Sequence, residues 1–128
     1  MADPTYKHIS ATMVDDVVVV EINTKEVQGP ALAMELGAEL SQVAAEFPAR
    51  KILLDFKRVN YLSSVAFAAL SKTVKNVRAA GGQIKFCNIE PSVRGAADVI
   101  FGAAVYGSQH AVEMHDSRAR GLVSFAMS

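Results

Sequence analysis

The chain lacks the residues and segments that several classes of protein require. It has a single cysteine, Cys87, which excludes an internal disulfide and a cysteine metal cluster and fits a reducing compartment best. Its 13 basic and 13 acidic residues cancel, so the net charge gives no argument for nucleic-acid binding. The longest stretch of low polarity, Val99–Gly107, is far shorter than the roughly 20 residues of a membrane helix, and Met1–Pro4 show no signal peptide. We therefore expect a cytoplasmic protein that binds neither nucleic acid nor membrane.

Enzyme signatures are also missing. The sequence holds no Gly-x-Ser-x-Gly elbow, no P-loop and no Gly-x-Gly-x-x-Gly turn. His110 and His115 stand five residues apart, a spacing that suits neither one helix face nor one strand face for holding a metal. Because no acid–base or nucleophilic constellation can be assembled, we predict no enzyme activity, no catalytic residues, no metal and no cofactor.

The sequence does contain enough apolar material for one core. With 128 residues, of which 51% are hydrophobic and 20% charged, the chain is predicted to form a single domain over residues 1–128 rather than a disordered region. Its charges are unevenly distributed: residues 1–46 carry eight acidic and two basic side chains (−6), residues 47–94 nine basic and two acidic (+7), and residues 95–128 sum to −1. This pattern fits either solvated helix faces that neutralise each other or a charged docking surface for a protein partner.

The periodicity of apolar residues predicts alternating strands and helices. Strands are expected near 7–13, 17–22, 51–56, 84–87 and 110–114, and helices over 30–47, 63–80, 91–99 and after Asp116-Ser117. Helices between strands require crossover connections, so most of the sheet should be parallel. The predicted fold class is α/β in the order ββαβαβαβα, with helices packed on a mixed, mostly parallel sheet. Its predicted core comprises Val18, Val20, Leu36, Leu40, Ile52, Leu54, Phe67, Leu70, Val74, Ile84 and Phe86.

Glycine and large apolar residues in the last third of the chain leave two questions open. Gly121 falls within the last predicted helix, where glycine is unfavourable. Phe101, Val105 and Tyr106 occupy a long link before the last strand, and they either fold back on the core or cover a second copy of the chain.

One segment joins a buried strand to a helix through a short loop. Residues 53–65 read Leu-Leu-Asp-Phe-Lys-Arg-Val-Asn-Tyr-Leu-Ser-Ser-Val, which places Ser63 and Ser64 at the predicted helix start. The unsatisfied N–H groups of a helix N-terminus suit a capping serine, and the same geometry would favour a phosphate on that serine. The residues alone leave both interpretations open.

A series of motifs follows in order along the chain: the strand Ile52–Asp55, the helix start Tyr61–Ser64, the Gly-Gly turn Ala80–Gln83, the strand and proline-led helix Phe86–Arg94, and the tail His110–Phe125. With this order of motifs the sequence resembles the STAS family, the sulphate-transporter and anti-sigma-factor-antagonist domains, over essentially its whole length. It looks most similar to bacterial stand-alone antagonists and their stressosome relatives. Leu62 stands where that family has aspartate, and Val65 where it has glycine.

The resemblance implies a function through binding rather than catalysis. It implies a regulatory module that binds a serine kinase acting as an anti-sigma factor, or a stressosome-type STAS protein, with a PP2C-type phosphatase as a further partner. Phosphorylation of Ser63, with Ser64 as second choice, would switch this binding. The alternative is a non-phosphorylated scaffold or small-ligand sensor in a signalling complex, and either module could form homo-oligomers. The expected partner surface comprises Lys57, Arg58, Asn60, Tyr61, Leu62, Ser63, Ser64 and Val65, made basic by Lys57 and Arg58 together with Lys72 and Lys75.

Overall fold

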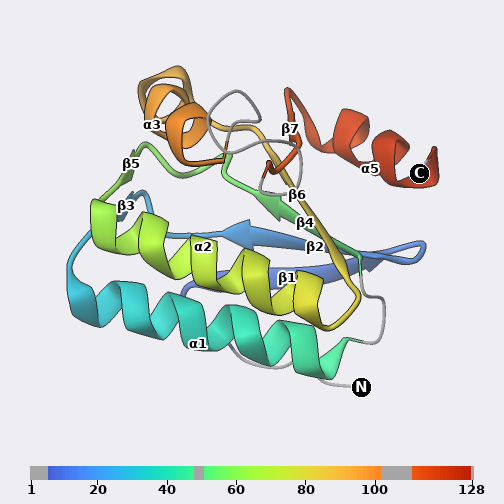
Figure 1. Cartoon of the computed structure of the whole chain (residues 1–128), viewed down its shortest axis with the longest axis horizontal. Coiled ribbons are helices and arrows are strands. Elements are labelled where there is room, and N and C mark those ends of the chain that lie inside the picture. The colour runs from blue at the N-terminus through green and yellow to red at the C-terminus, as the bar shows by residue number, and fades with distance from the viewer. Residues whose placement is uncertain (1–5, 48–50, 102–110, 128) are drawn as a thin grey trace.

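The computed structural model describes residues 6–47, 51–101 and 111–127. These residues form a five-stranded sheet in the strand order β1-β2-β4-β6-β7 and a separate pair of β3 with β5 (Figure 1). The strands are β1 (Ile9–Val14), β2 (Val17–Ile22), β3 (Glu26–Val27), β4 (Lys51–Asp55), β5 (Tyr61–Leu62), β6 (Gln83–Cys87) and β7 (Met114–His115). The helices are α1 (Pro30–Glu46), α2 (Ser64–Ala79), α3 (Pro91–Phe101) and α5 (Arg118–Ala126).

The sheet is mixed, as the sequence predicts. β1 and β2 are antiparallel and joined by the two-residue turn Asp15-Asp16, in which Asp15 has a positive φ of 55°. The pairs β2–β4, β4–β6 and β6–β7 are all parallel, because a helix or a longer segment intervenes between each strand and the next. The fold class is therefore α/β with a mostly parallel sheet.

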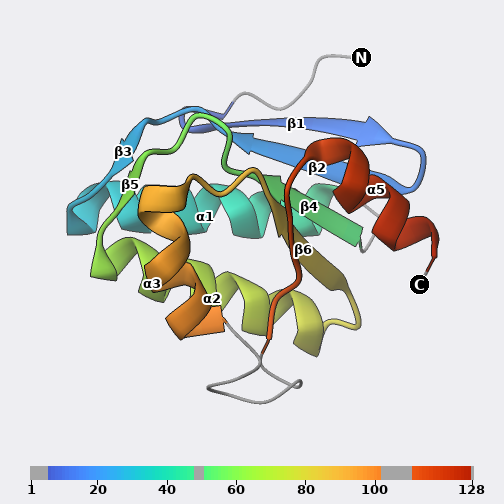
Figure 2. The ribbon, with the colours of Figure 1, turned by 90° about the horizontal axis from the view of Figure 1, so that it is seen from above.

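Helices cover both faces of the sheet. α1 and α2 lie side by side on one face, and α5 lies on the other, where it contacts β4, β6 and β7 (Figures 1 and 2). The larger core fills the space beneath α1, α2 and α3, and all eleven of the predicted core residues belong to it. A smaller core lies on the side of α5 and contains Val17, Val19, Leu53, Cys87 and Phe125.

The last strand differs from the expected range 110–114. β7 pairs with β6 only through Met114 and His115, so the strand begins later than the apolar pattern suggests. The preceding Val112 is apolar because it is buried in the larger core, and its N–H donates to the carbonyl of Phe101 at 3.0 Å rather than to a neighbouring strand. His110 lies outside the described residues.

Phe101, which precedes the long link, folds back on the core. It ends α3, is 3% exposed and packs edge-on against Phe86 with ring centroids 5.1 Å apart. Phe101 therefore belongs to the core rather than to a self-association surface, while Val105 and Tyr106 lie outside the described residues. Among the helices described, none has the length and apolar character needed to cross a membrane.

Candidate functional site

The start of α2 is held at the carboxyl-terminal edge of the sheet by two very short strands. β5 pairs in parallel with β3, so that Tyr61 lies opposite Glu26 and Leu62 opposite Val27. The backbone continues this pairing into the helix start, where Ser63 N–H donates to the carbonyl of Val27 at 2.9 Å. The position of Ser63 is therefore fixed by the segment before α1 as well as by its own strand.

Ser63 is the N-cap residue of α2. Its backbone is extended, and its Oγ accepts a hydrogen bond from the N–H of Ala66 at 3.2 Å. The first turn of α2 carries no acidic residue, so no carboxylate of that turn opposes a negative group at the positive end of the helix dipole. Ser63 is half-buried, whereas Ser64 is exposed as the first residue of the helix. The capping interpretation of the sequence is confirmed by the hydrogen bond that Ser63 accepts.

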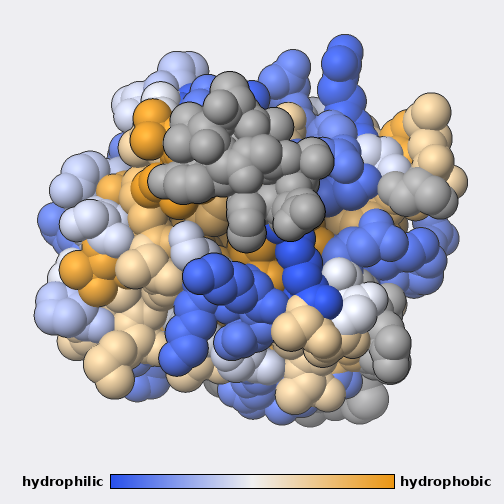
Figure 3. Space-filling model, in the orientation of Figure 1, coloured by the Kyte–Doolittle hydropathy of each residue, from blue (hydrophilic) through white to orange (hydrophobic). Residues whose placement is uncertain are grey.

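Exposed apolar side chains surround this helix start. Tyr61 is 48% exposed, Val65 44% and Met34, in the first turns of α1, 75%. Figure 3 shows apolar residues gathered over the amino-terminal ends of α1 and α2, with hydrophilic residues further along α2. Leu62, one of the expected partner-binding residues, is instead 8% exposed and packs in the larger core, so it offers a partner little side-chain surface.

Two grooves flank the helix start. A groove of about 430 Å³ lies between α2 and α3 and is lined on its α2 side by Ser64, Phe67 and Ala68. A second groove of about 460 Å³ lies between α1 and α2 and includes both Met34 and Val65. The first helical residues, Ser64 and Val65, therefore each line a different groove.

The charge around the helix start is mixed rather than uniformly basic. Lys57 and Asn60 are exposed in the preceding loop, but Arg58 lies 3.8 Å from the carboxylate of Glu21. Glu26 is exposed directly opposite Tyr61. The expected contributions of Lys72 and Lys75 fall about two and three turns along α2, away from Ser63.

A buried carboxylate fixes the loop that leads to Ser63. Asp55, at the end of β4, is 1% exposed. Its Oδ1 accepts from the backbone N–H of Lys57 at 2.9 Å and from Nδ2 of Asn88 at 3.0 Å. Its Oδ2 accepts from the guanidinium of Arg118 at 2.9 and 3.1 Å. One residue thus ties the loop, the end of β6 and the start of α5 together.

Sequence reasoning missed three contributors to this region. Arg118 and Asn88 are separated from Asp55 by 63 and 33 residues, and no local pattern connects them. The positive φ of Asn88, 58°, aims its amide at Asp55, and only the folded backbone reveals it. Met34 could have been found, because it lies off the apolar stripe of an otherwise amphipathic helix.

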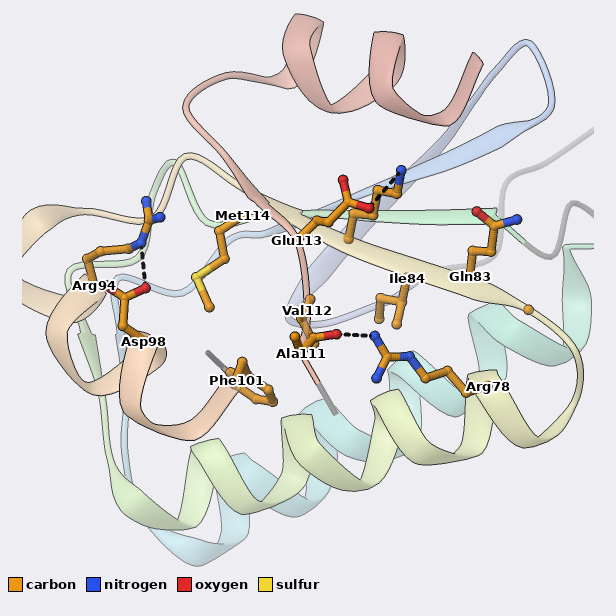
Figure 4. Close-up of a pocket in the computed structure, with 12 residues that line it drawn as sticks. Arg78, Gln83, Ile84, Arg94, Asp98, Phe101, Ala111, Val112, Glu113 and Met114 are labelled. Carbon is orange, nitrogen blue, oxygen red and sulfur yellow. Dashed lines mark hydrogen bonds and ion pairs between the residues drawn. The ribbon is translucent and has the colours of Figure 1, made fainter. Parts of the chain in front are cut away.

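Two further features of the described residues are a buried thiol and a cavity beside β6. Burial, with the nearby Asp55 carboxylate as a smaller cause, raises the pKa of the Cys87 thiol to about 12. A cavity of about 560 Å³ lies between β6, α3 and the segment before β7 (Figure 4). Its charged side chains interact with other groups of the same cavity, with Arg94 bound to Asp98 at 3.0 Å and Lys85 to Glu113 at 3.5 Å. Within the described ranges, no cluster of three or more histidine, cysteine or acidic side chains could hold a metal ion.

Comparisons with known proteins agree with this geometry. A family model described as the STAS domain matches residues 8–101, so the chain belongs to the STAS family. A search of curated proteins found no match. The family range runs from the segment before β1 through α3 and thus includes the whole helix start.

Solved structures show the same fold at low sequence identity. The unphosphorylated anti-sigma factor antagonist SpoIIAA is 16% identical with a TM-score of 0.64, covering 94% of this chain and 98% of its own. TM1081 of Thermotoga maritima is 13% identical with a TM-score of 0.74, covering 100% and 96%. A variant of RsbS from Moorella thermoacetica is 14% identical with a TM-score of 0.71, covering 94% and 97%. The chain is thus similar in fold to anti-sigma factor antagonists.

Proposed function

We propose that this protein is a regulatory module that binds a protein partner through the start of α2. The observation that supports this most is the exposed loop-to-helix junction, where Ser63 caps α2 between Tyr61 and Val65. Such junctions present residues on a rigid support while leaving them accessible. The partner we propose is a serine kinase that acts as an anti-sigma factor, or a STAS protein of the stressosome type, in the cytoplasm. The protein itself would act without catalysing a reaction.

Phosphorylation of Ser63 is the proposed switch. SpoIIAA, which is similar in fold, is known in both unphosphorylated and phosphorylated forms. A phosphate on Ser63 would carry about −1.5 to −2 charges and would sit at the positive end of α2, which favours the folded state. On docking, the same charge would have to be desolvated against the apolar Tyr61, Val65 and Met34, which weakens binding. Folding tolerates the modification while binding does not, as a switch requires.

A binding titration with purified anti-sigma kinase tests this proposal. We expect Ser63→Ala to retain the partner and Ser63→Asp to release it, with a dissociation constant at least tenfold higher, or about 1.4 kcal/mol. Ser64→Asp places the same charge one residue further along, at a position that does not cap the helix. Comparing the dissociation constants of Ser63→Asp and Ser64→Asp shows whether the effect of the charge is specific to the cap position.

Ser117 supplies a matched control. It is the N-cap of α5, and its Oγ accepts from the N–H of Arg120 at 3.2 Å, as Ser63 accepts from Ala66. Ser117→Ala and Ser117→Asp should change stability like the Ser63 variants and leave binding unchanged. If both Ser63 variants bind like the wild type, the partner uses a non-phosphorylated scaffold, the second function that the sequence left open. If no partner binds through this face, or if the Ser117 variants release it equally, the docking proposal is wrong.

A further inference from the structure

Two buried charges of the sheet lie at opposite ends of α5. Asp55, at the end of β4, is 1% exposed and binds the guanidinium of Arg118, the first residue of the helix, at 2.9 and 3.1 Å. Lys85 in β6 is 5% exposed, and its Nζ donates to Oγ of Ser124 in the last turn of the helix at 3.0 Å. A negative charge at the start of a helix and a positive charge at its end both complement the helix dipole. The sheet therefore fixes the direction of α5 by charge as well as by apolar contact.

The helix α5 depends on this docking for its stability. It has nine residues, fewer than the roughly 12 to 15 that an isolated helix needs in water. Its two buried residues are Gly121 and Phe125, so most of its side chains remain in contact with solvent. An element with few buried contacts opens locally while the rest of the domain stays folded. We therefore expect α5 to have two states, one docked and helical and the other detached and unfolded.

The carboxylate of Asp55 connects α5 to the loop between β4 and β5. Its Oδ2 accepts both hydrogen bonds from Arg118, while its Oδ1 accepts from the backbone N–H of Lys57 at 2.9 Å and from Nδ2 of Asn88 at 3.0 Å. When α5 detaches, the carboxylate loses the guanidinium, and a buried charge without its counter-charge is costly to keep out of water. Turning the carboxylate towards water lowers this cost, but it takes Oδ1 away from the N–H of Lys57.

Separate anchors hold the end of the same loop. The N–H of Asn60 donates to the carbonyl of Lys25 at 2.8 Å, and the N–H of Ser63 donates to the carbonyl of Val27 at 2.9 Å. Neither of these hydrogen bonds involves Asp55 or α5. Detachment of α5 should therefore loosen the turn that directly follows β4 and leave the start of α2 in place.

We propose that Arg118 is a positioning residue for the partner surface, and that the docking of α5 controls the basic part of that surface. With α5 docked, Arg118 holds Asp55, and Asp55 holds the turn that presents the exposed Lys57 and Arg58. With α5 detached, the two basic side chains lie on a loose turn, and ordering them against a partner costs affinity. The last step rests on the proposed function, which assigns this loop to the partner surface.

Amide hydrogen exchange of the full chain, resolved by NMR, tests the coupling without a partner. In Arg118→Ala we expect the amide of Lys57 to exchange at least about tenfold faster, because the hydrogen bond that protects it is weakened. The amides of Asn60 and Ser63 should keep their rates within about twofold, since their acceptors lie elsewhere. Arg120→Ala is the matched control, because it removes the same charge from an exposed residue of the same helix, and it should leave the Lys57 amide unchanged.

Phe125→Ala tests whether docking of the helix, rather than Arg118 alone, controls the loop. Phe125 is 1% exposed in the smaller core and lies at the other end of α5. Its truncation should release the amide of Gly121, which donates to the carbonyl of Ser117, and with it the amide of Lys57. Release of Gly121 without Lys57, or of neither amide, would overturn the proposal. Equal acceleration of Lys57, Asn60 and Ser63 in the Arg118→Ala chain, or the same effect in Arg120→Ala, would also overturn it.

The binding titration with the anti-sigma kinase separates this inference from the proposed function. Arg118→Ala should raise the dissociation constant about threefold to tenfold, and Arg120→Ala should leave it unchanged. If Ser63→Asp releases the kinase while Arg118→Ala binds it like the wild type, control by α5 is wrong and the proposed function stands. If the kinase does not bind through the start of α2, the proposed function fails, and the last step of this inference fails with it.

Discussion

Two helical glycines should respond in opposite directions to the same substitution. Gly95 lies in α3, and a Cβ at this position would meet nothing within 4 Å. Gly121 lies in α5, and a Cβ there would stand 2.7 and 2.9 Å from the two methyl carbons of Leu53. Leu53 is fully buried in the smaller core, so it has little room to move away.

The two expected free energies follow from this difference. Alanine is favoured over glycine by about 1 kcal/mol within a helix, so Gly95→Ala should stabilise the protein by up to that amount. Gly121→Ala gains the same propensity but forces Leu53 to shift, and overpacking of a core costs about 1 to 3 kcal/mol. Subtracting the unfolding free energy of Gly121→Ala from that of Gly95→Ala cancels the helix propensity that both variants gain. We expect this difference in unfolding free energy to be about 1 to 3 kcal/mol.

Urea unfolding monitored by circular dichroism measures this difference. If the slope of the free energy against urea concentration is the same in both variants, the difference follows from their midpoint urea concentrations. Leu53→Val shortens the crowded side chain, so the double variant with Gly121→Ala should be more stable than the sum of the two single effects. The steric reasoning would be refuted if both glycine variants raised the midpoint equally, or if the double variant showed simple additivity.

Three further changes test the core and the buried groups. Leu54→Ala should cost about 2 to 5 kcal/mol of unfolding free energy, because Leu54 is fully buried in the centre of the sheet; a loss below about 1 kcal/mol would contradict this. Asp55→Ala should cost about 3 kcal/mol and loosen α5, since it strips Arg118 and Asn88 of their buried acceptor; unchanged protection of the amides of α5 in hydrogen exchange would contradict it. Burial raises the pKa of Cys87 from 9.0 to about 12, so the folded state keeps a proton that the unfolded state loses. Stability should therefore fall as the pH rises from about 9 to 12, and this loss should be smaller in Cys87→Ala.

The order of the strands and helices was predictable because each depends on local periodicity. Each prediction rested on a pattern within a few neighbouring residues: the apolar stripe of α1, the apolar run of β2 and the two glycines that end α2. The structure confirms all three elements. The two-residue strands β3 and β5 were not predictable, because two residues are too few to show a period. The predicted range of the last strand was too early, because Val112 is apolar for packing in the larger core rather than for strand pairing.

The candidate site was predictable only in part. The sequence indicated that Ser63 begins a helix, and its capping hydrogen bond confirms this. It gave no means of telling Leu62, which turns into the core, from Tyr61, which faces solvent, since the alternation depends on pairing with β3. The mixed charge of the surface likewise depends on Glu21 and Glu26, which approach from another part of the chain.

The sequence by itself determined the fold class, eleven residues of the larger core and the start of a helix at Ser63 and Ser64. These follow from side-chain pattern and hydrogen bonding over a few neighbouring residues, which are the same in any context. The tertiary structure alone decided that Arg118 reaches Asp55, that Gly121 lets α5 approach Leu53, and that β1 is the first strand in the order of the described sheet. Each of these depends on which elements become neighbours in space, because contacts between distant residues form only after the chain has closed the loops between them.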